Sequence, residues 1–319
     1  MKYYFAPLEG ITGYVYRNAY EEVFHNVDKY FSPFLAPTVH NCFTSREKND
    51  ILPEHNKGLY LVPQILTNNA EHFLNTVQLL KQYGYKEVNL NLGCPSATVV
   101  TKKKGAGFLA EPELLQRFLE EIFTEDSIKI SIKTRIGMER QEEFPKLLEI
   151  FNQYPLEELI VHPRVQKDYY NNHPQWEAYE YAIAHSRNKL CYNGDIFSKE
   201  SYDLWKKQFP KEEQVMLGRG IISNPALIDT IEGREALSKE KWKRFHDGVY
   251  IGYQEIMSGE KNVLFKMKEL WFYMAYLFED SGKFLKKIKK ANRLKDYEAA
   301  VSELLREREL KEAPALFGK

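Results

Sequence analysis

The sequence predicts a (β/α)8 barrel followed by a helical bundle, and three observations lead to this fold class. Short apolar or β-rich runs recur through the first part of the chain. Several of these runs are followed by a turn and then by a segment with apolar residues at helical spacing. After about residue 235 this alternation stops and only helical periodicity remains. Eight parallel strands alternating with helices are what a closed (β/α)8 barrel requires.

Eight runs are candidate strands, and helical segments such as Ala70–Tyr83 and Glu113–Phe123 lie between them. The candidate strands are Tyr3–Leu8, Lys29–Phe34, Leu59–Ile65, Glu87–Leu92, Lys129–Thr134, Glu158–His162, Lys189–Tyr192 and Gln214–Leu217. An open doubly wound sheet is the alternative. The first strand is not followed by Gly-x-Gly-x-x-Gly, which disfavours that alternative.

The chain is predicted to contain two domains, a barrel over residues 1–235 and a helical domain over residues 236–319. In the helical domain one amphipathic helix carries Trp242, Phe245 and Val249, and the next carries Val263 to Met274. Two further helical stretches lie at 283–291 and 297–310. A chain of 319 residues is long enough for a large barrel and a small second domain.

The composition is that of a globular protein, with 43% hydrophobic and 28% charged residues. Lys plus Arg and Asp plus Glu both number 45, which argues against a uniformly basic surface but leaves local patches open. Three cysteines without a Cys-x-x-Cys pair disfavour a disulfide framework or a zinc site and suggest a reducing cytoplasm. Neither a signal peptide nor a membrane helix is expected. We expect a cytoplasmic protein that is a monomer and binds no metal.

Polar residues recur at the carboxyl ends of the predicted strands, which all meet on one face of a barrel. Since active sites of such barrels lie on that face, this convergence is the strongest functional signal in the sequence. The residues are Glu9 and Gly10, Gln64, Asn91 to Pro95, Lys133 and Arg135, His162 and Arg164, Asn193 to Asp195, and Gly218 to Gly220.

The loop Asn91-Leu92-Gly93-Cys94-Pro95 is the most specific of these motifs. Its Gly and Pro favour a tight turn that leaves the Cys94 thiol near the mouth of the barrel. The Lys102–Gly107 stretch that follows is suited to a mobile flap, with a solvated surface loop as the simpler reading. Cys191 lies within an apolar strand and is expected in the core, whereas Cys42 has no neighbours that suggest chemistry.

Gly218-Arg219-Gly220 follows the last strand and predicts a phosphate site together with Asn193-Gly194-Asp195. Glycines let the backbone approach an anion, and a following helix offers free N–H groups. Asn224 and Pro225 are expected to be the N-cap and first residue of that helix. An ordinary turn is the alternative for Gly-Arg-Gly taken alone.

Lys133 and His162 are candidates for contacts with a bound cofactor, since a Lys beside a flavin would stabilise the charge of the reduced ring. Surface salt bridges are their alternative role. Between Lys261 and Lys295 there are ten Lys or Arg residues against three acids, a balance of +7. Such a segment fits nucleic-acid phosphates or an acidic membrane. The Tyr and Trp residues of this region fall at core spacing.

Together these motifs resemble the tRNA-dihydrouridine synthase family. The resemblance spans the whole barrel, and its most specific part is the combination of Gly-Cys-Pro, Asn-Gly-Asp and Gly-Arg-Gly. The motifs that carry it are Ala6 to Gly10, Pro63-Gln64, Asn91 to Pro95, Lys133 to Arg135, His162 to Arg164, Asn193 to Asp195 and Gly218 to Gly220. Leu8 and Pro163-Arg164-Val165 depart from the usual family residues.

The resemblance implies reduction of the C5=C6 bond of uridine in tRNA, with FMN as cofactor, NADPH as reductant and Cys94 as general acid. It further implies that Asn91 places the uracil and that Arg135 and Arg164 face the RNA. The implied cofactor-binding residues are Pro7, Leu8, Glu9, Gln64, Lys133, His162, Asn193, Gly194, Asp195, Gly218 and Arg219. Two other functions remain open, an FMN enzyme acting on a free pyrimidine, as dihydroorotate dehydrogenases do, and a non-catalytic RNA-binding barrel.

Overall fold

The computed structural model describes residues 1–38 and 43–311, so Cys42 lies outside the described residues. Inter-residue contacts divide the chain into two compact units. The first unit joins Met1–Glu9, Asp28–Gly194 and Lys211–Met216, and the second joins Gly10–Val27, Asp195–Pro210 and the chain from Leu217 onward.

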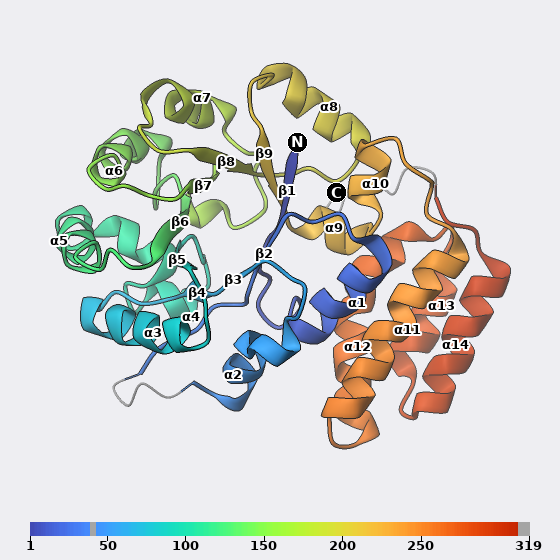
Figure 1. The fold of residues 1–319 in the computed structure, drawn as a ribbon. Coiled ribbons are helices and arrows are strands. Elements are labelled where there is room, and N and C mark those ends of the chain that lie inside the picture. The colour runs from blue at the N-terminus through green and yellow to red at the C-terminus, as the bar shows by residue number, and fades with distance from the viewer. Residues whose placement is uncertain (39–42, 312–319) are drawn as a thin grey trace. The chain divides into compact units, whose positions relative to one another are not determined.

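The first unit is built on a parallel sheet in the order β3-β2-β1-β9-β8-β7-β6-β5-β4 (Figure 1). Every predicted strand run overlaps an observed strand, and the predicted (β/α)8 fold class is confirmed. The strands are β1 (Lys2–Phe5), β2 (Lys29–Phe31), β3 (Leu61–Val62), β4 (Gln64–Ile65), β5 (Glu87–Leu92), β6 (Lys129–Arg135), β7 (Leu159–His162), β8 (Leu190–Asn193) and β9 (Gln214–Leu217).

Pro63 explains why an eight-strand barrel contains nine strand segments. It separates β3 from β4, and its missing backbone N–H interrupts the ladder there. β3 pairs with β2, and β4 pairs with β5, so the two ends of the strand order are halves of one run. The sheet therefore closes on itself as a barrel.

The first unit has helices around the outside of the sheet and one short helix in the Cys94 loop that follows β5 (Figure 1). They are α2 (Ser45–Ile51), α3 (Ala70–Gln82), α4 (Ala97–Val100), α5 (Pro112–Ile122), α6 (Phe144–Phe151) and α7 (Trp176–His185). The side chain of Asn69 caps α3 by accepting from the backbone N–H of His72 at 2.8 Å. Phe73, one turn into α3, packs edge-on against Phe118 of α5 with ring centroids 5.9 Å apart. These apolar stripes bury one face of each helix.

The second unit is helical. Its helices are α1 (Tyr14–Phe24), α8 (Lys199–Gln208), α9 (Arg219–Ser223), α10 (Leu227–Ile231), α11 (Lys239–Ile256), α12 (Glu260–Met274), α13 (Gly282–Lys290) and α14 (Leu294–Glu307). All four predicted C-terminal helices are present. Gly252 lets α11 approach α1, since a Cβ there would lie 2.7 Å from Val15 Cγ1. The boundary near residue 235 stays a prediction, because this unit also takes in α1 and α8.

A network of aromatic and polar side chains forms the centre of the helical unit. Trp242, Trp271 and Tyr297 are fully buried, as their core spacing predicts. The Trp271 Nε1–H donates to the Tyr297 hydroxyl at 2.8 Å, and that hydroxyl lies 2.6 Å from His246 Nε2. Burial lowers the pKa of His246, although Asp247 opposes this. A neutral His246 that accepts the Tyr297 proton completes the hydrogen bonds of the Tyr297 hydroxyl, which also accepts from Trp271.

One local prediction was wrong: Asn224 does not begin a helix. α9 runs from Arg219, directly after Gly218, to Ser223, and Asn224 is its C-cap. The Asn224 side chain instead accepts from the backbone N–H of Ala226 at 3.1 Å. None of the described helices combines the length and the apolar character needed to cross a membrane.

A buried ionic cluster lies at the amino-terminal end of the barrel strands. Lys29 Nζ donates to both carboxylate oxygens of Glu87, at 3.1 and 3.0 Å, and to Glu158. Burial lowers the pKa of the Lys29 ammonium, but the two carboxylates outweigh it and raise that pKa above its ordinary value. Lys29 and Glu87 begin β2 and β5, and Glu158 directly precedes β7; because these strands are not adjacent, this one cation connects different sides of the barrel.

We predict that Lys29→Met lowers the free energy of unfolding by about 3–5 kcal/mol, because two buried carboxylates lose their cation. The measurement is equilibrium denaturation. Lys129→Met is the matched control, since Lys129 also begins a strand but pairs with Glu157 at the surface, with 61% of its side chain exposed. The control should lose less than about 1 kcal/mol. Equal losses in the two variants would contradict the role given to Lys29.

Candidate active site

Polar side chains meet at the carboxyl ends of the strands in the first unit. Gln64 begins β4, Asn91 lies near the end of β5, Lys133 near the end of β6, and His162 and Asn193 end β7 and β8. Because these strands are parallel neighbours, their carboxyl ends form one rim of the barrel. The predicted convergence of these five residues on one rim is therefore present.

A chain of side-chain amides crosses the inside of this rim. The Gln64 Nε2 amide donates to Asn89 Oδ1, and the Asn91 Nδ2 amide donates to Gln64 Oε1, both at 2.7 Å. Asn89 Nδ2 in turn donates to the Ser131 hydroxyl at 3.0 Å. All four side chains are buried. Each amide thereby fixes the orientation of the next, which a buried network must do to avoid unsatisfied groups.

The last amide of this chain holds the Cys94 loop. Asn91 Oδ1 accepts from the backbone N–H groups of Gly93 and Cys94, at 3.0 and 2.9 Å. The Ala106 N–H donates to the Cys94 carbonyl at 3.1 Å. The Gln166 side chain donates to the Pro95 carbonyl at 3.0 Å. The loop is thus anchored from three directions, and the Cys94 side chain is only partly exposed.

The environment of Cys94 favours the protonated thiol. Burial raises its pKa above the ordinary value, although a backbone N–H at Ser96 and the nearby Arg135 cation lower it. Glu9 adds to the rise and Lys133 subtracts from it. The Cys94 thiol therefore carries its proton at neutral pH and can donate it. Cys191 is fully buried, as predicted, and burial raises its pKa too.

The Lys102–Gly107 stretch, which was predicted to be a mobile flap, is mostly exposed in its first half and buried in its second half. Gly105–Ala110 form a 3-10 helix in which Gly105 to Leu109 are buried. Gly105 has a φ of +55°, and a Cβ there would lie 2.9 Å from the Cys94 carbonyl oxygen. Motion of this stretch stays a prediction, but its second half is packed in this structure. This second half supports the Cys94 loop, while Lys102 and Lys103 before it are exposed.

Lys133 is a cation that pairs with no anion among the described residues. Its Nζ has no hydrogen-bond or ion-pair partner within residues 1–38 and 43–311. Burial, with a contribution from Arg135, lowers its pKa to about 8. A desolvated ammonium in this position can bind an electron-rich or anionic group that enters the rim.

Arg135 is almost fully buried, and its guanidinium N–H groups donate hydrogen bonds to backbone carbonyls. Its guanidinium donates to the carbonyls of Gly93, Val165 and Tyr169, at 3.1, 2.7 and 2.6 Å. It connects the Cys94 loop to the loop after β7. Direct contact of Arg135 with RNA stays a prediction, and the structure gives it this positioning role.

Arg164 is held in a similar way within the loop after β7. It is 1% exposed, donates to the Asn172 carbonyl at 2.6 Å, and lies 3.0 Å from His162 Nε2. Asp168 supports the same loop by accepting from the Val165 N–H at 3.1 Å. His162 is thereby oriented at the rim, and contact of Arg164 with RNA likewise stays a prediction.

The residues after β1 leave the sheet earlier than expected. The strand ends at Phe5 rather than Leu8. Leu8 packs on an apolar cluster inside the barrel that includes Cys191 and Met216. Burial raises the pKa of Glu9, which forms an ion pair with Arg46.

The remaining predicted site residues fall in different units. In the first unit, the Asn193 Nδ2 amide donates to the Met216 carbonyl at 2.9 Å. Gly194 has no room for a side chain, because a Cβ there would lie 2.1 Å from the Tyr192 hydroxyl oxygen. In the second unit, Arg219 donates to Asp195 at 2.7 Å in a partly buried ion pair that follows Gly218.

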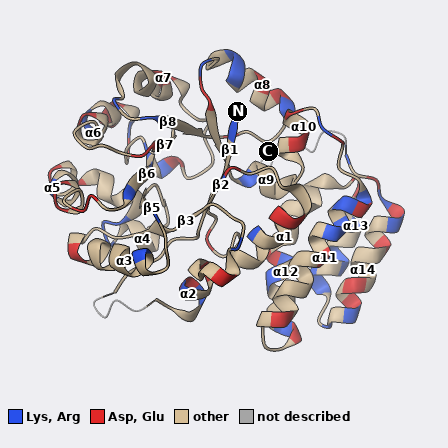
Figure 2. Ribbon diagram, viewed as in Figure 1, with Lys and Arg blue, Asp and Glu red and all other residues tan. Residues whose placement is uncertain are grey.

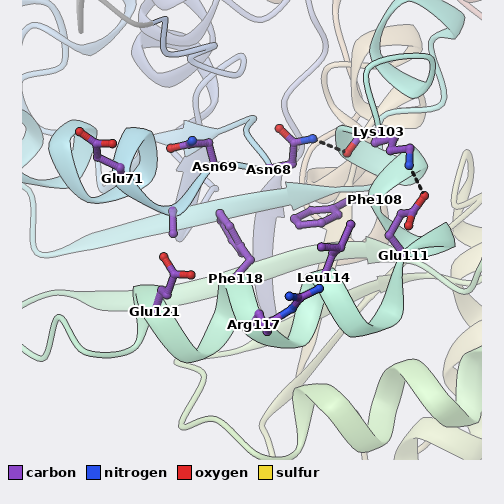
Figure 3. A pocket seen from close by; sticks show the side chains of 11 residues that line it. Asn68, Asn69, Glu71, Lys103, Phe108, Glu111, Leu114, Arg117, Phe118 and Glu121 are labelled. Carbon is purple, nitrogen blue, oxygen red and sulfur yellow. Dashed lines mark hydrogen bonds and ion pairs between the residues drawn. The ribbon is translucent and has the colours of Figure 1, made fainter.

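A cavity of about 410 Å³ opens between α3 and α5 (Figure 3). Its lining includes Lys103 and Arg117 but also Glu71, Glu111 and Glu121. Lys103 forms an ion pair with Glu111 at 2.6 Å across this lining. None of the predicted site residues line it, so we do not assign it to the rim. Among the described residues no group of three His, Cys, Asp or Glu side chains could hold a metal ion.

Sequence reasoning missed the residues that support the site, Asn89, Ser131, Gln166 and Asp168. For Asn89 a signal existed, because β5 alternates polar and apolar residues from Glu87 to Leu92 and so places Glu87, Asn89 and Asn91 on one face. Polar side chains on the inner face of a barrel need partners there.

The fold and rim define a (β/α)8 barrel whose strand ends present a protonated thiol, a fixed amide chain and an ammonium with no partner in the described part of the chain. A family model described as dihydrouridine synthase (Dus) matches residues 4–316. The chain belongs to this family.

Individual proteins agree with this assignment. A probable tRNA-dihydrouridine synthase of Staphylococcus aureus (strain Mu50 / ATCC 700699) is 29% identical over 268 residues, covering 78% of this chain and 77% of the relative. The tRNA-dihydrouridine synthase B of Pasteurella multocida (strain Pm70) is 22% identical over 230 residues, covering 72% and 68%. A structure of morphinone reductase in complex with tetrahydroNAD superposes with a TM-score of 0.53 at 14% identity, covering 80% of this chain and 93% of that chain. This last likeness concerns the fold alone.

We predict that the Cys94 thiol reacts with iodoacetamide at neutral pH more slowly than a free cysteine peptide, because only the thiolate reacts and the raised pKa keeps it scarce. The rate should climb as pH rises. The measurement is mass spectrometry of the peptide that contains residue 94. Asn91→Ala removes two anchors of the loop and should move the rate toward that of the free peptide. A wild-type rate at pH 7 above that of the free peptide would show a thiolate instead.

Proposed function

We propose that this protein reduces the C5=C6 bond of uridine in tRNA to give dihydrouridine. Membership of the dihydrouridine synthase family and the tRNA-dihydrouridine synthase names of its relatives support this activity. The single observation in the structure that carries it is the partly buried Cys94 thiol, which keeps its proton beside the unpaired Lys133 ammonium. An acid and a cation at one barrel rim suit reduction of a conjugated carbonyl compound.

The proposed cofactor is FMN, and the rim fits a flavin ring in three respects. The Lys133 ammonium meets no anion within residues 1–38 and 43–311, and Gln64 has one amide hydrogen left after its bond to Asn89. Leu8 adds an apolar surface beside these polar groups. Flavin N1, C2=O and N5 are the acceptors that such donors serve, so we assign Lys133, Gln64 and His162 to the ring edge and Pro7 to Glu9 to its surroundings. When bound, the flavin supplies hydride to the substrate.

The phosphate of the cofactor is assigned to two loops by the family motifs. Asn193 ends β8 and Gly194 follows it, whereas Asp195, Gly218 and Arg219 belong to the second unit. The absence of space for a Cβ at Gly194 supports a close approach of backbone in the first of these loops. NADPH is the proposed reductant.

Cys94 acts as the general acid in this proposal. Addition of hydride at C6 of uracil puts negative charge on the C4 carbonyl system, and C5 must then receive a proton. A thiol with a raised pKa holds its proton until that charge develops, and Sγ–H then donates to C5. Asn91 keeps the loop in place and helps place the uracil. Arg135 and Arg164 fix the two loops that border the base.

The target base must leave the stacked RNA to reach a barrel rim, so we propose that the enzyme binds the uridine in an extruded conformation. The basic segment of residues 261–295 supplies affinity for phosphates, and residues 236–319 are the proposed tRNA-binding domain. Because its relatives act on tRNA, we propose the cytoplasm as its compartment.

We predict that Cys94→Ala keeps bound flavin and its reduction by NADPH but loses at least about 100-fold in turnover on tRNA, the effect expected of a lost general acid. Flavin absorbance measures the first two properties, and mass spectrometry of dihydrouridine in tRNA measures the third. Cys94→Ser is the matched variant and should recover part of the activity. Unchanged turnover in Cys94→Ala would remove the acid role.

The same assay decides between RNA and a free pyrimidine as substrate. The proposal requires turnover on folded tRNA and little on uridine monophosphate. The reverse preference would favour an enzyme of free pyrimidines.

A further inference from the structure

Helix α12 exposes two large aromatic rings. Phe265 is 69% exposed and Phe272 is 54% exposed, while Val263, Met267 and Trp271 of the same helix are buried. The two phenylalanines are seven residues apart, two helical turns, and therefore lie on one face. Exposed aromatic side chains are costly to leave in water, and a pair on one face marks a binding surface.

Cations share this face. Lys261 and Lys268 are spaced four and three residues from Phe265, so the face alternates cation and ring from Lys261 to Phe272. Lys268 Nζ donates at 2.6 Å to the carbonyl of Ala291, the C-cap residue of α13. The Glu260 carboxylate accepts at 3.3 Å from the backbone N–H of Leu294, the first residue of α14. These bonds bring the α13–α14 junction against α12.

The junction is strongly basic (Figure 2). It carries Lys289, Lys290, Arg293 and Lys295 around Ala291. These four residues and Lys261 have no ion-pair partner in the described part of the chain. Lys287, by contrast, pairs with Glu303 of α14. The unpaired cations therefore gather where the exposed rings are.

We infer that Phe265 and Phe272 are stacking platforms for unpaired nucleotides of the RNA substrate, with Lys261 and the α13–α14 junction binding the flanking phosphates. The inference rests on the proposed function. Aromatic faces set among unpaired cations are the combination that binds single-stranded nucleic acid without sequence preference. A flat dimer interface or a membrane surface would need an apolar face, which Lys268 interrupts here.

The spacing of the rings limits how RNA binds. Seven residues of α-helix place the two Cα atoms about 10 Å apart along the axis. Two neighbouring bases of a continuous stack are much closer than this, so each ring receives a base from a different point of the strand. The face therefore selects a loop with splayed bases rather than a regular duplex.

The test compares Phe265→Ala and Phe272→Ala with the control Ile251→Ala, which removes another exposed apolar side chain, 52% exposed, from α11. Each phenylalanine variant should bind tRNA about 5- to 100-fold more weakly. It should raise KM and leave kcat at saturating tRNA unchanged. The control should match wild type. Phe265→Trp should retain affinity, and its added fluorescence should be quenched by tRNA.

Salt dependence separates stacking from charge. The phenylalanine variants should keep the wild-type slope of affinity against salt, whereas Lys261→Gln and Lys290→Gln should reduce it. Wild-type affinity for tRNA in both phenylalanine variants would overturn the inference. A change in the sedimentation of these variants would also overturn it, because it would indicate an interface between copies. A loss of binding to anionic vesicles would overturn it as well, because it would indicate a membrane-binding surface. A wild-type enzyme inactive on any tRNA would instead refute the proposed function.

Discussion

The hydrogen-bonded chain from Ser131 through Asn89 and Gln64 to Asn91 is the constraint on which the site depends. Each of its amides is buried and satisfies the next, so no single one can rotate without leaving an unpaired polar group. Its last member holds the N–H groups of Gly93 and Cys94. The position of the thiol is therefore set by interactions inside the barrel and not by the loop alone. Buried supports of this kind orient a catalytic group more accurately than a solvent-exposed loop could.

The two ends of the barrel use buried polarity for different purposes. At the amino-terminal ends of the strands, Lys29 joins Glu87 and Glu158 into a closed ionic cluster that stabilises the fold. At the carboxyl ends, Lys133 has no anion among the described residues and is available to a ligand. β5 contributes to both, since Glu87, Asn89 and Asn91 point to the same inner face along the strand. This division agrees with the general separation of stability and activity between the two faces of such barrels.

The sequence predicted the barrel because its strands are short, apolar and regularly spaced, and it predicted the rim because polar residues recur where those strands end. It did not predict how the rim is held. Gln166 binds Pro95 across 71 positions of the chain, and Arg135 binds Val165 and Tyr169, contacts that no local pattern encodes. The error at Asn224 has a similar origin. Asn is a common N-cap residue, but the helix here begins directly after Gly218, upstream of Asn224. Exposure of Phe265 was also hidden, because a phenylalanine at helical spacing is more often buried.

We propose that the amide chain positions the Cys94 thiol for proton donation to the substrate. Single-turnover reoxidation of the reduced flavin by tRNA, followed by absorbance in wild type and in Asn91→Ala, tests it most directly. Asn91→Ala should slow reoxidation by tRNA at least about tenfold, since a displaced acid lowers the rate by at least this much. Reduction of the flavin by NADPH should keep its wild-type rate. Reoxidation by tRNA at the wild-type rate in Asn91→Ala would contradict the claim.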